Sequence, residues 1–254
     1  MTILEASGLA VGYGERVVGR GLDVRLESGE VLALLGPNGG GKTTLLKTLL
    51  GLLPPLGGEV RLAGRALGEL SVRERARLIA YVPQSHAGAF PFSVADVVMM
   101  GRSAHADLLS RPSARDRDAA RAAMDRLGVS RLAERPYTMV SGGERQLALI
   151  ARALAQEPRV VALDEPTASL DFGNQGLVMR EIRSLAQAGL GVVFSTHDPN
   201  HALRHADRAL LIRDGACMAQ GPSRDVLTAP ALRRLYDAEI EVVEAAGARV
   251  FLAS

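Results

Sequence analysis

A glycine-rich segment constrains this chain more than any other feature; it reads Gly36-Pro37-Asn38-Gly39-Gly40-Gly41-Lys42-Thr43-Thr44. It matches the pattern G-x-x-x-x-G-K-[ST], which forms a phosphate-binding loop between a strand and a helix. The flanking sequence fits that context, because the apolar run 31–35 predicts a buried strand and residues 45–50 predict the start of a helix. The segment therefore predicts a site where backbone N–H groups and a helix N-terminus converge on a phosphate.

Two side chains of this segment and one earlier in the chain suggest that the phosphate belongs to a nucleotide. Lys42 can reach the β- and γ-phosphates of a nucleotide, and the Thr43 hydroxyl can coordinate Mg²⁺. Tyr13 lies between two glycines and could stack on a purine ring, although an isolated aromatic residue more often serves packing. A glycine-rich turn with a surface lysine is the alternative, but it explains neither the strand before the segment nor the helix after it.

Length and composition set wider limits. The 254 residues fit one large domain or a core with an inserted subdomain, and 47% hydrophobic residues suffice for a substantial core. A net charge of +2 does not call for a nucleic-acid partner. No apolar run approaches the roughly 20 residues that span a bilayer, and no signal peptide is evident. With Cys217 as the single cysteine, no intrachain disulfide can form, so we expect a cytosolic protein.

The order of the predicted elements indicates an α/β protein with an insertion. Residues 1–35 predict strands and turns, and residues 72–78 predict a helix with Ser71 as N-cap and Glu74 at the capping-box position. A strand is predicted at 79–82, and residues 87–157 show a helical pattern without a strand pattern. Further buried strands are predicted at 160–166 and 191–197, followed by a hairpin over 208–220 and weak helix and strand signals at the end.

Polar side chains follow several predicted strands. Gln84 comes after the strand at 79–82, and His197 ends the strand at 191–197. Asp164 and Glu165 end another strand, where successive residues point to opposite faces. One of these carboxylates can therefore face Mg²⁺ while the other faces a water molecule beside the terminal phosphate.

Ser141-Gly142-Gly143-Glu144 predicts a second glycine-bearing helix N-terminus, with Ser141 as N-cap and exposed amides that could bind an anion. His197, His201 and His205 are spaced like metal ligands on one helix face. We expect no metal cluster there, because Pro199 predicts a helix that starts only after His197.

These motifs, in this order, resemble the nucleotide-binding subunits of ATP-binding-cassette (ABC) transporters over nearly the whole chain. The resemblance implies a single ABC nucleotide-binding domain, 1–254, with the P-loop NTPase fold. Its RecA-like core and N-terminal antiparallel β subdomain would comprise 1–86 and 158–254. An inserted α-helical subdomain carrying the signature motif would comprise 87–157.

The resemblance also implies roles for single residues. Residues 36–44 and Tyr13, at the position of the family's adenine-stacking aromatic, would bind ATP, and the catalytic group would be Lys42, Gln84, Glu165 and His197. Mg²⁺ would be held by Thr43, Gln84 and Asp164. Gln84 would sense the metal and γ-phosphate, Glu165 would polarise the attacking water, and His197 would orient it.

The signature motif, Ser141, Gly142, Gly143 and Glu144, would close over the ATP of a second copy in a head-to-tail homodimer, next to the D-loop Ser169-Leu170-Asp171. The chain departs mildly from the family, with Val140 and Glu144 where Leu and Gln are usual and Gly40 where Ser or Ala is commoner. No departure removes a charged or catalytic group.

Within the family, the closest resemblance is to ATPases of importers for iron–siderophore, haem, vitamin B12 or related metal chelates. It is carried by 81–84, 92–102, 143–146 and 221–227. It implies two membrane permease subunits, an indirect solute-binding protein, no nucleic acid, and a peripheral position on the cytoplasmic face of the membrane. Residues 85–102 would receive a coupling helix.

Import of molybdate or tungstate is the alternative function. A soluble ABC ATPase of DNA repair is a remote alternative, because the insert lacks the heptads and cysteines usual in such proteins.

Overall fold

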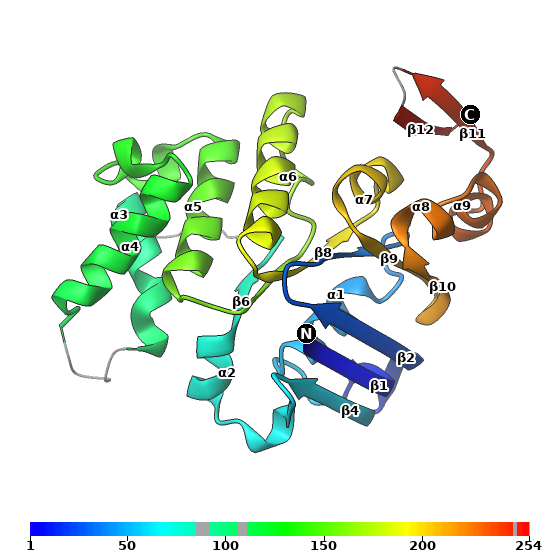
Figure 1. Cartoon of the computed structure of the whole chain (residues 1–254), viewed down its shortest axis with the longest axis horizontal. Coiled ribbons are helices and arrows are strands. Elements are labelled where there is room, and N and C mark those ends of the chain that lie inside the picture. Colours follow the sequence, from blue (N-terminus) through cyan, green and yellow to red (C-terminus); the bar gives the residue numbers. More distant parts are fainter. Residues whose placement is uncertain (85–91, 106–110, 246–247, 254) are drawn as a thin grey trace.

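A computed structural model describes residues 1–84, 92–105, 111–245 and 248–253 (Figure 1). An antiparallel sheet comes first in the chain, with strand order β2-β1-β4-β5. Its strands are β1 (Thr2–Tyr13), β2 (Arg16–Glu27), β4 (Gly57–Leu62) and β5 (Arg65–Ala66). Burial alternates over residues 22–26 of β2, because one face of this sheet packs on a helix of the core, and register shifts interrupt the alternation along β1.

A second sheet forms the centre of the molecule, with strand order β10-β9-β3-β8-β7-β6. Its strands are β3 (Val31–Leu35), β6 (Ile79–Val82), β7 (Val160–Leu163), β8 (Gly191–Thr196), β9 (Arg208–Arg213) and β10 (Ala216–Pro222). The pairs β3–β8, β3–β9, β7–β8 and β6–β7 are parallel, and β10 is antiparallel to β9. The carboxyl ends of its parallel strands therefore meet at one edge.

Strand β3 separates two hydrophobic cores. Leu32 and Leu34 belong to the core shared with the antiparallel sheet and with α1 (Lys42–Leu49). Ala33 and Leu35 belong to the other core, which includes α6 (Phe172–Gln187) and α7 (Pro199–His205). The period of two along the strand thus explains why all five residues of β3 are buried.

The inserted part of the chain forms a helical layer at one end of the molecule (Figure 1). Its helices are α3 (Val94–Met99), α4 (Ala114–Arg126) and α5 (Gly142–Ala155), joined by short 3₁₀ turns at Met100–Ala104, Ser130–Leu132 and Tyr137–Met139. Arg102 is buried among them and donates to Asp116 at 2.9 Å and to Glu157 at 2.8 Å. Hydrogen bonds from the Ser113 side chain and backbone, with a smaller contribution from Arg102, lower the pKa of Asp116 to about 2.

Two small groups of elements complete the fold. The 3₁₀ turn Leu67–Glu69 and α2 (Val72–Leu78) precede β6, and α2 begins with the predicted capping box of Ser71 and Glu74. The chain ends with α8 (Ser223–Val226), α9 (Ala229–Tyr236) and the hairpin of β11 (Ile240–Ala245) and β12 (Ala248–Ala253). Residues of α9 and of the hairpin join the large core, so this end of the chain is packed.

The predicted fold class is confirmed: an antiparallel β sheet, a mostly parallel sheet with helices on its faces, and a helical insertion. Helix α1 begins at Lys42, three residues earlier than the pattern predicted, because the apolar run marks only the buried part of the helix. The predicted boundary at residue 87 lies outside the described residues. In the described part of the chain, no helix combines the length and apolarity needed to cross a membrane.

Candidate functional site

The glycine-rich segment joins the carboxyl end of β3 to α1, as the motif requires. Gly36 donates its N–H to the Thr196 carbonyl of β8 at 3.3 Å, and a side chain here would collide with the Ile212 carbonyl of β9. Gly41 is the N-cap of α1 with a φ of 99°, in the left-handed region that favours glycine. The segment therefore passes close over the central sheet and turns into the helix.

The N-terminus of α1 is not capped by a side chain, and its first turn contains no acidic residue. Lys42, only 5% exposed, donates from Nζ to the carbonyl oxygens of Gly36 at 2.7 Å and Pro37 at 2.9 Å. Its ammonium group therefore lies inside the curve of the loop, where a phosphate would be held.

A cavity of about 510 Å³ opens over this helix start. It is lined by Tyr13, Arg16, Val18, Asn38, Gly39, Gly40, Gly41, Lys42, Thr43, Thr44, Gln84 and Glu165. Tyr13 lies at its edge, half exposed, and its hydroxyl accepts from Thr44 at 3.5 Å. The volume is in the range of pockets that hold small ligands. The cavity thus brings together most of the residues predicted to bind ATP.

Asp164 lies beside the loop, directly after β7. Its Oδ1 accepts from the Thr43 hydroxyl at 3.1 Å and from Ser195 at 2.6 Å, and its Oδ2 accepts from the Tyr81 hydroxyl at 3.3 Å. Burial and the neighbouring Asp164 raise the pKa of Tyr81, so its hydroxyl keeps its proton and donates. The hydroxyl of Thr43, the carboxylate of Asp164 and the nearby Gln84 amide are oxygen ligands of the kind that Mg²⁺ prefers.

Glu165, 9% exposed, lies between two basic side chains. Its Oε1 is 3.4 Å from Lys42 Nζ, and its Oε2 is 2.8 Å from Nδ1 of His197, which follows the end of β8. The prediction that strand geometry continues to this residue is wrong, because β7 ends at Leu163 and Glu165 has a φ of 43°. This turn, rather than strand alternation, sends Glu165 away from Asp164 and toward His197.

Ser195 is a site residue that the sequence analysis missed. It is fully buried in β8, donates to Asp164 Oδ1 at 2.6 Å and accepts from the backbone N–H of Glu165 at 2.8 Å. A serine two residues before the histidine, directly after the apolar run 192–194, was the available signal, since buried hydroxyls need partners. Arg16 and Val18 of β2 were also missed as cavity-lining residues.

The helix α7 begins at Pro199, as predicted, so His197 precedes it. His201 Nδ1 lies 3.4 Å from the Thr167 hydroxyl, and burial lowers the pKa of both His201 and His205. These two histidines are therefore disposed to be neutral and packed.

The signature segment begins α5, with Ser141 as its N-cap. The Ser141 hydroxyl accepts from the Glu144 N–H at 3.3 Å, and the Glu144 carboxylate accepts from the Ser141 N–H at 3.0 Å. Arg131 donates to the same carboxylate at 2.7 Å. These hydrogen bonds, the Ser141 backbone bond most, lower the pKa of Glu144.

The structure does not bring the signature segment into the cavity of its own chain: within the described residues, the lining includes none of Ser141, Gly142, Gly143 and Glu144. They lie instead beside the D-loop and the start of α6. A side chain at Gly143 would collide with Asn174, and one at Gly142 would lie 3.8 Å from the Ser169 carbonyl. Asp171 caps α6 by accepting from the Asn174 N–H at 2.9 Å.

Comparison with known proteins agrees with this geometry. A family model described as ABC transporter matches residues 20–168. The hemin import ATP-binding protein HmuV of Gloeobacter violaceus is 47% identical over 230 residues, covering 86% of this chain and 83% of that protein. An ABC transporter ATP-binding protein of Haemophilus influenzae is 43% identical over 241 residues, covering 95% and 92%.

Among solved structures, one similar chain comes from a transporter assigned to the metal-chelate type, in an inward-facing conformation. It is 34% identical, with a TM-score of 0.88, and the match covers 100% of this chain and 97% of that chain. The family model, the relatives and the solved structure are all ABC transporter proteins. The chain therefore belongs to the ABC transporter family, as a nucleotide-binding subunit.

Proposed function

We propose that this protein hydrolyses ATP to drive the import of a metal-chelate solute, such as haem, an iron–siderophore or cobalamin, through a separate membrane permease. The observation that carries the catalytic part is the position of the Glu165 carboxylate. It lies beside the phosphate loop, 3.4 Å from Lys42 and 2.8 Å from His197. The solute class rests on the similarity to hemin import and metal-chelate type proteins.

Hydrolysis of ATP depends mainly on positioning and on stabilising charge. Lys42 exchanges its carbonyl partners for the β- and γ-phosphates, which also releases Glu165 from the ion pair. Glu165 then accepts a hydrogen bond from the attacking water, and His197 orients that water and the γ-phosphate.

The remaining residues hold the nucleotide and its metal. Tyr13 stacks on the adenine, and the amides of residues 38–44 bind the phosphates. Thr43, Gln84 and Asp164 would hold Mg²⁺, which neutralises charge on the β- and γ-phosphate oxygens. Gln84, which lines the cavity, would report the metal to the helical subdomain.

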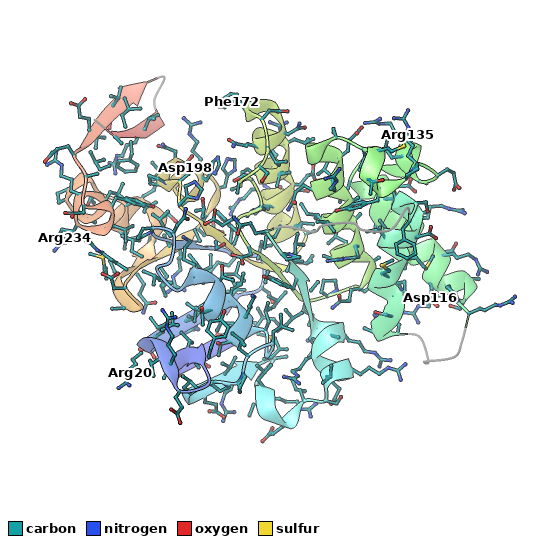
Figure 2. The ribbon with its side chains drawn as sticks, turned by 180° about the vertical axis from the view of Figure 1, so that it is seen from behind. Arg20, Asp116, Arg135, Phe172, Asp198 and Arg234 are labelled. Atoms are coloured by element: carbon teal, nitrogen blue, oxygen red, sulfur yellow. The ribbon has the colours of Figure 1, made fainter. Side chains whose placement is uncertain are left out.

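A head-to-tail homodimer completes each site in this proposal. The signature segment lies outside its own cavity, so it is available to the ATP of a second copy. Phe172 follows the D-loop and is 91% exposed at the start of α6 (Figure 2), and Met139 near the signature is also exposed. Aromatic residues and methionine are enriched in protein–protein interfaces.

A groove of about 530 Å³ between the core and the helical layer is the proposed docking site for the permease. It is lined by residues 50–52, which follow α1, by α2, by Met100 and by the end of α5, and Leu52, Val72 and Met100 leave apolar surface exposed there. A helix with an apolar face suits such a groove. Of the predicted docking residues 85–102, Met100 and Gly101 line it, and 85–91 lie outside the described residues.

In this proposal the protein lies on the cytoplasmic face of the membrane with two permease subunits, and a solute-binding protein delivers the solute to them. The experiment is to purify the tagged full chain from detergent-solubilised membranes and identify the proteins bound to it. The complex is then reconstituted in liposomes, and ATP hydrolysis is measured with haem, a ferric siderophore, cobalamin or molybdate. We expect a polytopic permease and stimulation by a metal chelate. Stimulation by molybdate alone would reject the proposed solute class. Co-purification with DNA and no permease would reject the proposed role in transport.

A further inference from the structure

The C-terminal part of the chain contacts the segment that carries His197. Helix α7 follows β8 directly, and β12 packs against α7 while α9 packs against β9. Asp198, next to the histidine, and Arg234 of α9 lie on the same flank of the molecule (Figure 2). The Tyr236 hydroxyl, at the end of α9, donates to the carbonyl oxygen of His197 at 2.7 Å.

The short link between β8 and α7 is held at each step by a side chain. The Asp198 N–H donates to the Thr196 hydroxyl at 3.0 Å, and the Asn200 N–H donates to the Asp198 carboxylate at 2.8 Å. The Asn200 side chain also pairs with the backbone of Phe251 in β12, donating at 3.0 Å and accepting at 2.8 Å. The His197 carbonyl and the Asn200 side chain are thus both tied to C-terminal elements, Tyr236 of α9 and Phe251 of β12.

The partner elements are themselves firmly packed. Leu232 and Leu235 of α9 are buried in the large core, together with Ile240 and Phe251 of the hairpin. Arg233 donates to the Ile240 carbonyl at 3.0 Å and joins α9 to β11. Tyr236 therefore extends from a fixed helix, so its hydrogen bond can hold the His197 backbone in place.

We propose that Tyr236 is a positioning residue for ATP hydrolysis, acting through the backbone of His197 on the placement of the imidazole beside Glu165. The inference rests on the proposed function, because it requires His197 to act in hydrolysis and assigns no chemistry to Tyr236 itself. The His197 side chain is 52% exposed and contacts Glu165 from its Nδ1, so surrounding packing alone does not fix it. Its position follows from the backbone, and a displacement of about 1 Å can slow an enzyme by about a hundredfold.

The chemistry of Tyr236 suits this task. Burial, with smaller contributions from Asp198 and Glu165, raises the pKa of its hydroxyl. The hydroxyl therefore stays protonated and remains a hydrogen-bond donor throughout the working pH range. The His197 carbonyl oxygen accepts a hydrogen bond from this hydroxyl. Phenylalanine at position 236 would fill the same space without the hydroxyl.

The test compares Tyr236→Phe with the wild type in the full chain, by phosphate release with Mg²⁺ and ATP. We expect kcat to fall about tenfold while KM for ATP stays within about twofold, because the phosphate loop is untouched. Tyr137→Phe is the matched control: the Tyr137 hydroxyl is buried in the helical layer, without a hydrogen-bond partner in the described structure. This control should keep the wild-type kcat.

A double variant separates positioning from general destabilisation. If Tyr236 acts through His197, adding Tyr236→Phe to His197→Ala should cause no further loss of kcat. An equal loss in both backgrounds, or a wild-type kcat in Tyr236→Phe, would overturn the inference. An unchanged kcat in His197→Ala would instead contradict the proposed function, so the two failures are distinguishable.

Discussion

Two helices of this protein begin with glycine-rich segments, and the two beginnings are built in opposite ways. At α1, Gly41 provides no side-chain cap, the first turn carries no acidic residue, and the helix start faces a cavity. At α5, Ser141 and Glu144 form a capping box, and a carboxylate lies in the first turn. The first N-terminus is left for a ligand, whereas the second has already satisfied some of its own amides.

This difference between the two helix N-termini suits the two roles that we propose for them, nucleotide binding at α1 and completion of the partner's site at α5. In the proposed function, Lys42 and the amides around it bind the phosphates of a nucleotide held by their own chain. The capping box fixes the Ser141 hydroxyl at the start of α5, away from the residues that line the cavity, so in the proposed dimer it would contact the ATP of the second copy. On this account α1 determines binding, and α5 determines turnover in the dimer.

The largest effect should come from the uncapped helix. Lys42→Ala removes the cation inside the loop, and we expect kcat/KM for ATP to fall by a hundredfold or more, because hydrogen bonds to charged groups contribute about 1.5–3 kcal/mol each. Lys47→Ala is the matched control, since Lys42 and Lys47 are the chain's two lysines and both lie in α1. Steady-state phosphate release measures both. Equal kinetics in the two variants would remove Lys42 from the phosphate site.

A smaller effect should come from the capped helix. Ser141→Ala removes the hydroxyl offered to the second copy, and we expect kcat to fall about tenfold with ATP binding to the monomer unchanged. Ser113→Ala deletes the equivalent N-cap of α4, so each variant should lose about 1 kcal/mol of stability. Phosphate release and nucleotide binding are measured for both. Equal loss of turnover in the two would mean that Ser141 serves only as a cap.

The smallest effect concerns pH and the Glu144 carboxylate. Its pKa is lowered in the folded protein from the usual 4.5, so its stabilising effect is present above that value and is lost as pH falls below it. Glu144→Gln should therefore be less stable than the wild type by under about 1 kcal/mol at neutral pH, since Arg131 is exposed. Urea unfolding from pH 3 to pH 7 measures the difference. A difference independent of pH would contradict the role of the charge.

Local patterns predicted much of this fold because they act over a few residues. The strand before the phosphate loop, the capping box of α2 and the strand β6 were predicted from apolar runs and one cap motif. Ser195 could not be placed in the site, because its bonds to Asp164 and Glu165 depend on the pairing of β7 with β8. The elements at the end of the chain could not be predicted either, because α9 and β12 are stabilised by contacts with the core, β9 and α7.

One measurement tests the proposed roles of Glu165 and of the signature segment together. Glu165→Gln keeps the shape of the side chain but removes the charge that polarises water, so ATP should bind and persist. Light scattering of this variant with Mg²⁺ and ATP measures its mass and, with radiolabelled nucleotide, its stoichiometry. The account predicts a species of twice the chain mass holding two nucleotides, which disappears when Ser141→Ala is added. A monomer that carries ATP, or one that hydrolyses it at the wild-type rate, would contradict it.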